Sequence, residues 1–118
     1  MLFGYIYQMS MNLLDYHVLL ALSSGPMHGY AIKDAVAQDS DGTQAPRAGT
    51  LYRIIARLIS AGHVRETSAP ADAPLHPGHT RRYYALTPAG RRTLAEQARL
   101  LRGAAAQAER RLGASGRS

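Results

Sequence analysis

The sequence predicts a mainly α-helical fold that carries a small β-hairpin. Three observations support this prediction. Three segments of the first half repeat apolar residues at helical spacing, the period then becomes typical of strands around a proline-rich stretch, and a Thr-Pro pair opens a long helical segment. The chain has 118 residues, of which 46% are hydrophobic, and this is enough for one domain with a modest core.

Two helices are expected before residue 43. In "NLLDYHVLLALSSGP", Asn12 stands where an N-cap is expected, Asp15 follows three residues later, and Gly25-Pro26 supplies a stop. The segment "HGYAIKDAVAQDSDG", which begins at residue 28, predicts a second and shorter helix that ends in a loop. The apolar residues 1–12 are either an arm that packs on a partner subunit or lie upstream of a later start.

The third helix is predicted in "RAGTLYRIIARLISAGHV", residues 47–64. Its apolar residues recur at i, i+3, i+4, i+7 and i+8, and Gly62 ends the pattern. At about 100° per residue they form one stripe that faces the core. This predicted core stripe consists of Leu51, Ile54, Ile55, Leu58 and Ile59.

A hairpin and a long last helix follow. "HVRETS" and "TRRYYALT" predict two strands, and "APADAPLHPGH" between them predicts a flexible tip. Thr87-Pro88 predicts the start of a helix that runs to about Leu112, before a flexible tail at residues 113–118.

The last helix carries a second apolar pattern, spaced 4, 3, 4, 3 and 4 as in a coiled-coil seam. The seam either packs on its own domain or pairs with a second copy of the chain. We expect the second, because a long projecting helix has little of its own domain to cover. The expected dimer interface consists of Leu94, Ala98, Leu101, Ala105, Ala108 and Leu112.

The order of helix, helix, helix, strand, loop, strand and helix is that of a winged helix-turn-helix domain, here residues 13–87, with a C-terminal dimerisation helix at 88–112. In this arrangement the third helix enters the major groove of DNA. Thr50, Arg53 and Arg57 share the face opposite its core stripe, and Tyr52 lies at the border. Arginine suits this face because its planar fork binds phosphate or guanine through two hydrogen bonds.

The distribution of charge agrees with a polyanionic partner. Residues 1–46 carry one lysine against four aspartates, whereas residues 47–118 carry thirteen arginines against four acidic residues. An anionic membrane surface is the rival interpretation. Arg81 and Arg82 of the wing are further candidates for DNA contact, although strand alternation from Tyr84 and Leu86 would turn Arg82 inward.

The stretches "LDYHVLLALSSGPMHGYAIKDAV", "GTLYRIIARLISAGHV" and "RRYYALTPAGRRTL" together resemble the PadR family of bacterial transcriptional regulators, over nearly everything from residue 14 to residue 112. The resemblance implies a homodimeric winged helix repressor that binds a palindromic operator in double-stranded DNA. It places "GTLY" (Gly49, Thr50, Leu51 and Tyr52) at the start of the recognition helix and "HGY" (His28, Gly29 and Tyr30) near phosphate.

The sequence departs from this family just before "GTLY". Family members often have serine or asparagine there with proline or arginine, whereas this chain has Arg47-Ala48. A side-chain N-cap worth about 1 kcal/mol is therefore lost, and Arg47 is expected to contact phosphate instead. The wing tip is also longer than usual, which leaves its part in DNA contact open.

Other classes of function find little support. The chain has no cysteine, nucleophile elbow, phosphate-binding glycine loop or paired catalytic carboxylates, so we expect no enzyme, cofactor or metal. His17 and His63 are interpreted as structural histidines. We expect a cytoplasmic protein without a membrane anchor. Two alternatives stay open: a winged helix module that binds a protein partner, and a regulator relieved by a small apolar effector between the dimer's helices.

Overall fold

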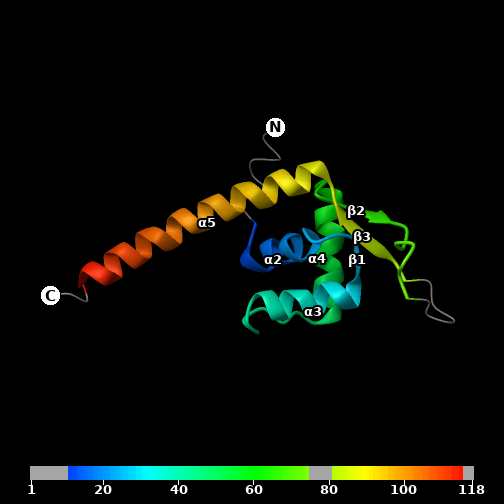
Figure 1. The fold of residues 1–118 in the computed structure, drawn as a ribbon, viewed down its shortest axis with the longest axis horizontal. Coiled ribbons are helices and arrows are strands. Elements are labelled where there is room, and N and C mark those ends of the chain that lie inside the picture. Colours follow the sequence, from blue (N-terminus) through cyan, green and yellow to red (C-terminus); the bar gives the residue numbers. More distant parts are fainter. Residues whose placement is uncertain (1–10, 75–80, 116–118) are drawn as a thin grey trace.

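A computed structural model describes residues 11–74 and 81–115 of the chain. It confirms the mainly helical fold with a small sheet and a long C-terminal helix (Figure 1). Residues 1–10 of the proposed arm (1–12), and residues 75–79 of the expected wing tip (69–79), lie outside the described residues.

Three helices build the body of the domain. They are α2 (Leu13–Leu22), α3 (Gly29–Asp39) and α4 (Ala48–Ser60). The predicted capping box is confirmed, because the Asn12 side chain accepts a hydrogen bond from the Asp15 N–H (2.8 Å) and Asp15 accepts one from the Asn12 N–H (3.3 Å). Gly62, with φ of 82°, ends α4 in the left-handed conformation that favours glycine.

The sheet has one more strand than the sequence predicted. Strands β2 (Val64–Thr67) and β3 (Tyr83–Leu86) form the expected hairpin, with Val64 opposite Leu86. β1 (Met27–His28) pairs with the other edge of β3, so the order is β1-β3-β2. A two-residue strand has no periodicity of its own, and only its pairing with β3 defines it.

The last helix, α5 (Pro88–Ser115), leaves the domain at its top and extends well beyond it (Figure 1). It continues three residues past the predicted end, into the segment expected to be a tail. A single exposed glycine costs only about 1 kcal/mol in a helix, so Gly113 alone does not terminate it. Within the described residues, no helix is both long and apolar enough to cross a membrane.

One hydrophobic core joins all of these elements. Leu51, Ile54, Ile55 and Leu58 are buried as predicted, but Ile59 lies at the rim of the core stripe and is 38% exposed. The core cluster comprises Val18, Leu19, Ala21, Leu22, Ile32, Val36, Leu51, Ile54, Ile55, Leu58, Val64, Tyr84 and Leu94. It fixes α4 so that the opposite face of this helix remains accessible.

Candidate nucleic-acid interface

The outer face of α4 carries the polar residues that the sequence placed there. Tyr52 and Arg53 are exposed, and Thr50 is half-buried. One turn apart on the same face, Arg53 donates a long hydrogen bond of 3.4 Å to the Thr50 hydroxyl. This bond holds the guanidinium group over the first turn of α4 and uses one of its five donors.

The start of α4 confirms the lost cap. Arg47 is the N-cap residue and makes no side-chain capping bond, and Arg47, Ala48 and Gly49 are all exposed. The first N–H groups of a helix have no partners within the helix, and together with the helix dipole they favour an anion. This end of α4 therefore has the electrostatics of a phosphate contact.

Arg57 has a structural task that the sequence did not reveal. Its guanidinium group forms an ion pair with Asp15, whose side chain is only 2% exposed, while Arg57 itself is 48% exposed. Asp15 thus serves both the capping box of α2 and the attachment of α2 to α4. Because Arg57 already neutralises a buried carboxylate, it is a weaker candidate for reading DNA than Arg53.

A second group of side chains lies where α3 begins and the wing returns. His28 is the N-cap of α3, its Nδ1 accepting from the Ala31 N–H (3.2 Å), while its Nε2 lies 3.0 Å from Arg81 Nη1. Arg81 also lies over the ring of Tyr30, with 5.7 Å between Cζ and the ring centroid. Tyr30 is 64% exposed, so this cluster places an aromatic hydroxyl and a guanidinium group at the surface.

Tyr52 connects this cluster to α4. A Cβ atom built on Gly29 would collide with the hydroxyl of Tyr52. Residue 29 must therefore be glycine for Tyr52 to lie across the start of α3. The "HGY" and "GTLY" segments, which are about 20 residues apart in the sequence, meet through this contact.

The two arginines of the wing differ in their surroundings. Arg81 belongs to the His28 cluster, whereas Arg82 is 75% exposed with Glu66 3.8 Å away. The expectation that Arg82 would begin on the inward face is wrong, because it precedes β3. Tyr83, Tyr84 and Ala85 are all buried, since β3 is the central strand of the sheet.

The end of α4 is attached to the start of α5 by a bracket of hydrogen bonds, a feature the sequence did not show. The Thr87 hydroxyl donates to the Gly62 carbonyl (2.6 Å) and accepts from the Gly90 N–H (3.0 Å). Buried His63 lies with Nε2 3.2 Å from the hydroxyl of Thr93, which confirms its structural role. Burial lowers the pKa of His63, so the neutral ring is favoured.

The six residues of the expected dimer seam differ in how far the protomer buries them. Leu94 belongs to the core of its own domain, and Ala98 is half-buried. Leu101, Ala105, Ala108 and Leu112 are exposed, the last by 73%. The part of the seam open to a partner therefore begins after Ala98.

Three packed helices, a three-stranded wing and an exposed polar face on the third helix define a winged helix-turn-helix protein. Residues 18–96 match the model of the transcriptional regulator PadR-like family. This match covers most of the chain, and the protein therefore belongs to that family of transcriptional regulators.

A curated relative from Streptomyces fradiae, an uncharacterised 37.1 kDa protein in a transposon, is 42% identical over 81 residues. These residues are 69% of this chain and 21% of the relative, so the chain matches only about a fifth of that protein's length.

Solved structures of similar fold include a PadR-like transcriptional regulator from Bacillus cereus. Its TM-score is 0.70 at 18% identity, with 85% of this chain and 91% of that chain covered. A PadR family regulator from Clostridium difficile has a TM-score of 0.67 at 20% identity, with 86% and 99% covered. Bacillus subtilis PadR in complex with operator DNA has a TM-score of 0.58 at 20% identity, with 73% and 46% covered. At these identities the likeness establishes the fold.

Proposed function

We propose that this protein is a homodimeric, sequence-specific DNA-binding repressor. The observation that carries the proposal is the outer face of α4, where Tyr52 and Arg53 are exposed and Thr50 is half-buried, opposite a buried apolar stripe. A helix of this kind fits the major groove, and Arg53 is the residue best placed to bind a guanine edge. The Bacillus subtilis relative of the same fold was solved with operator DNA, which supports this assignment.

The remaining candidates act on the DNA backbone in this proposal. Arg47 and Gly49 at the start of α4 receive one phosphate, and the cluster of His28, Tyr30 and Arg81 receives another. Arg82 adds charge from the wing, and Arg57 supports α4 from its pair with Asp15. Such contacts set the position of the protein on the duplex without selecting a sequence.

Dimerisation through α5 would place two copies of α4 on one palindromic operator. We expect half-sites about 34 Å apart, one turn of B-DNA. A mobility-shift assay on the DNA upstream of this protein's own gene, with footprinting, tests this directly. Two protected half-sites in successive major grooves support the proposal, and protection without any sequence preference contradicts it.

Arg53→Ala tests the assignment of the recognition helix. We expect specific affinity to fall by about 1–3 kcal/mol, with preference relaxed at one base pair of each half-site. Arg111→Ala is the matched control, because it removes one exposed arginine near the C-terminal end of α5, far from α4 (Figure 1). Equal losses in both variants would show that net charge alone governs binding.

A protein-interaction module is the alternative function. DNA binding should weaken steeply with salt, because each neutralised phosphate releases counterions. Apolar binding to a protein partner would be almost insensitive to salt. A salt titration with upstream DNA therefore separates the two functions.

The proposal includes relief of repression by a small apolar effector between α2 and α5 of the dimer. Leu13, Leu100 and Leu101 are large apolar residues that stay exposed in the protomer on these two helices. A thermal-shift screen with small aromatic compounds, followed by release of operator DNA, tests this part alone. Compounds that stabilise the protein without releasing DNA would contradict it.

A further inference from the structure

The helix α5 carries a row of arginines that the proposed function does not use. Arg92, Arg99, Arg102 and Arg110 follow each other at separations of 7, 3 and 8 residues, and all four are exposed. At about 100° per residue these separations keep the four side chains on one side of the helix. The row is about 27 Å long at 1.5 Å per residue. We call these four residues the arginine face of α5.

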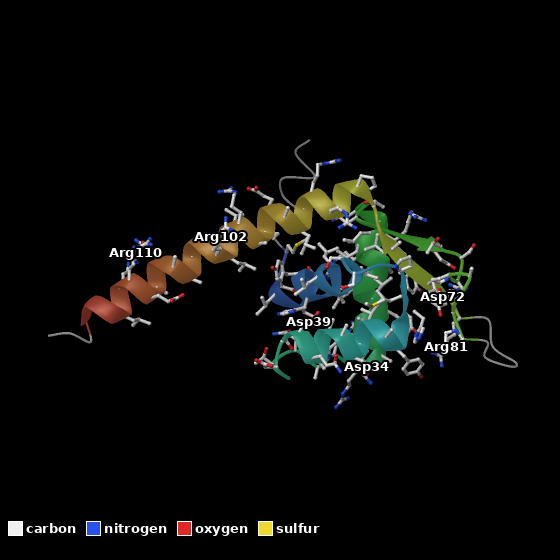
Figure 2. All side chains as sticks on the ribbon, viewed as in Figure 1. Asp34, Asp39, Asp72, Arg81, Arg102 and Arg110 are labelled. Atoms are coloured by element: carbon white, nitrogen blue, oxygen red, sulfur yellow. The ribbon has the colours of Figure 1, made fainter. Side chains whose placement is uncertain are left out.

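This face is separate from both surfaces described above. Leu101, Ala108 and Leu112 of the dimer seam lie nearly opposite it around the helix. Figure 2 shows Arg102 and Arg110 on the side of α5 that is turned away from α2 and α3, whereas Arg81 lies beside the wing at the other end of the molecule. Neither the proposed dimer nor DNA bound at α4 would cover the arginine face.

Acidic neighbours compensate only part of this charge. Glu96 accepts hydrogen bonds of 2.6 and 3.2 Å from Arg99, which lower its pKa and keep it ionised. Arg110 donates to Gln107, a neutral side chain. Residues 88–113 carry six arginines against Glu96 and Glu109, so a clear excess of positive charge remains.

The residues between the arginines indicate the kind of partner. Ala95, Gly103 and Ala106 fill the row, and no aromatic or large apolar side chain lies in it. A specific protein interface needs buried aromatic or apolar anchors, and single-stranded nucleic acid is bound by stacking on aromatic rings. A helix that binds membranes needs an exposed apolar side beside its basic residues, and the apolar side of α5 is the one that the proposed dimer would cover. Duplex DNA is a rigid rod with regularly spaced charges, and binding to its backbone requires none of these features.

We propose that the arginine face of α5 is a second binding surface, which holds the phosphate backbone of duplex DNA without regard to sequence. The small residues let the duplex approach the helix closely, and the planar guanidinium groups bind phosphate oxygens in pairs. A protein bound to its operator through α4 then holds a second DNA segment through α5. This inference goes beyond the proposed function, since it concerns a different surface and a different segment of DNA.

Bridging between two duplexes provides the test. Two duplexes of unrelated sequence, one with a donor and one with an acceptor fluorophore, are mixed with the full chain at low salt. We expect energy transfer with the natural protein and its loss with Arg92→Gln, Arg99→Gln, Arg102→Gln and Arg110→Gln combined. Glutamine keeps the helix propensity and much of the side-chain length, and circular dichroism verifies that α5 is intact.

A second measurement separates this surface from the recognition helix. The same fourfold variant should bind upstream DNA with nearly unchanged affinity, whereas Arg53→Gln should lose operator preference and still bridge. Bridging that persists in the fourfold variant, or operator affinity that falls in parallel with bridging, would overturn the proposal. The bridging assay does not depend on the proposed operator, because the two duplexes used in it have unrelated sequences. It can therefore be interpreted even if no operator is found.

Competition identifies the occupant. Polyglutamate and phosphatidylserine vesicles are added to the bridged complex, each at the same charge concentration as an unlabelled duplex. Displacement chiefly by the duplex supports the proposal. Equal displacement by either of the other two polyanions would show that the arginine face does not prefer DNA.

Discussion

Arg57 and Asp15 show how one charged side chain can belong to the surface and to the core at once. The carboxylate is buried and needs a cation, whereas the guanidinium group is half in water. Removal of the arginine leaves the buried carboxylate of Asp15 without a cation. Removal of the aspartate's charge leaves Arg57 unpaired but still solvated by water.

We therefore predict unequal effects on stability. Arg57→Gln should lower the free energy of unfolding by about 2–3 kcal/mol, less than a fully buried pair would lose, because water screens the exposed arginine. Asp15→Asn should cost about 1 kcal/mol, since the amide still offers an oxygen to the Asn12 N–H. Urea unfolding followed by circular dichroism at fixed protein concentration measures both. A larger loss for Asp15→Asn would contradict this account.

His63 gives the protein a dependence of stability on pH. Burial lowers its pKa in the folded state, so the unfolded chain binds more protons once the pH approaches the ordinary pKa of histidine. The contribution is fully present above that value and is lost as the pH falls. We predict that the free energy of unfolding decreases between roughly pH 7 and pH 5, and less so in His63→Gln. Parallel pH profiles of the two proteins would refute a role for His63.

At the scale of elements, the bracket of hydrogen bonds between α4 and α5 decides how these two helices are oriented relative to each other. The Thr87 hydroxyl bonds to both helix ends, and a Cβ atom at Gly90 would collide with the backbone carbonyl of His63. A shift of the start of α5 would therefore be passed to the end of α4. In a dimer built on α5, this junction sets the distance between the two copies of α4.

The same substitution at two glycines of α5 should have opposite effects. Gly90→Ala should destabilise the protein by about 2 kcal/mol, because backbone must move to admit the methyl group. Gly103→Ala should stabilise it by up to about 1 kcal/mol, because the added Cβ meets nothing within 4 Å and alanine favours the helix. Thermal unfolding compares the two, and a shift of the same sign in both would contradict the packing at Gly90.

At the scale of the whole molecule, the length of α5 matters most. The chain measures 63 Å along its longest axis and 34 and 25 Å along the others, so this helix reaches far beyond the body of the domain (Figure 1). Its apolar residues beyond Ala98 have no domain to cover. A second copy of the chain is the partner we propose for them.

We predict that Leu101→Asp combined with Leu112→Asp yields a monomer. Operator affinity should fall by about 100-fold, because a monomer loses the effective concentration that linkage gives to its second half-site. Light scattering coupled to size exclusion measures the mass, and Gln107→Asp, off the apolar stripe, is the control. If the doubly substituted protein stays dimeric, the dimer interface lies elsewhere and the prediction is wrong.

The sequence by itself determined the type and order of the main elements, the capping box and the amphipathic character of α4. These features depend on local chemistry. The spacing of apolar residues, the helix caps and the turn-forming residues all involve positions that are close together in the chain. Only the tertiary structure decided which distant residues the polar side chains contact. Asp15 meets Arg57 from 42 positions away, Arg81 meets His28 from 53, and β1 exists only because β3 lies beside it. Such contacts arise from the packing of distant segments, for which a single sequence carries no periodic signal.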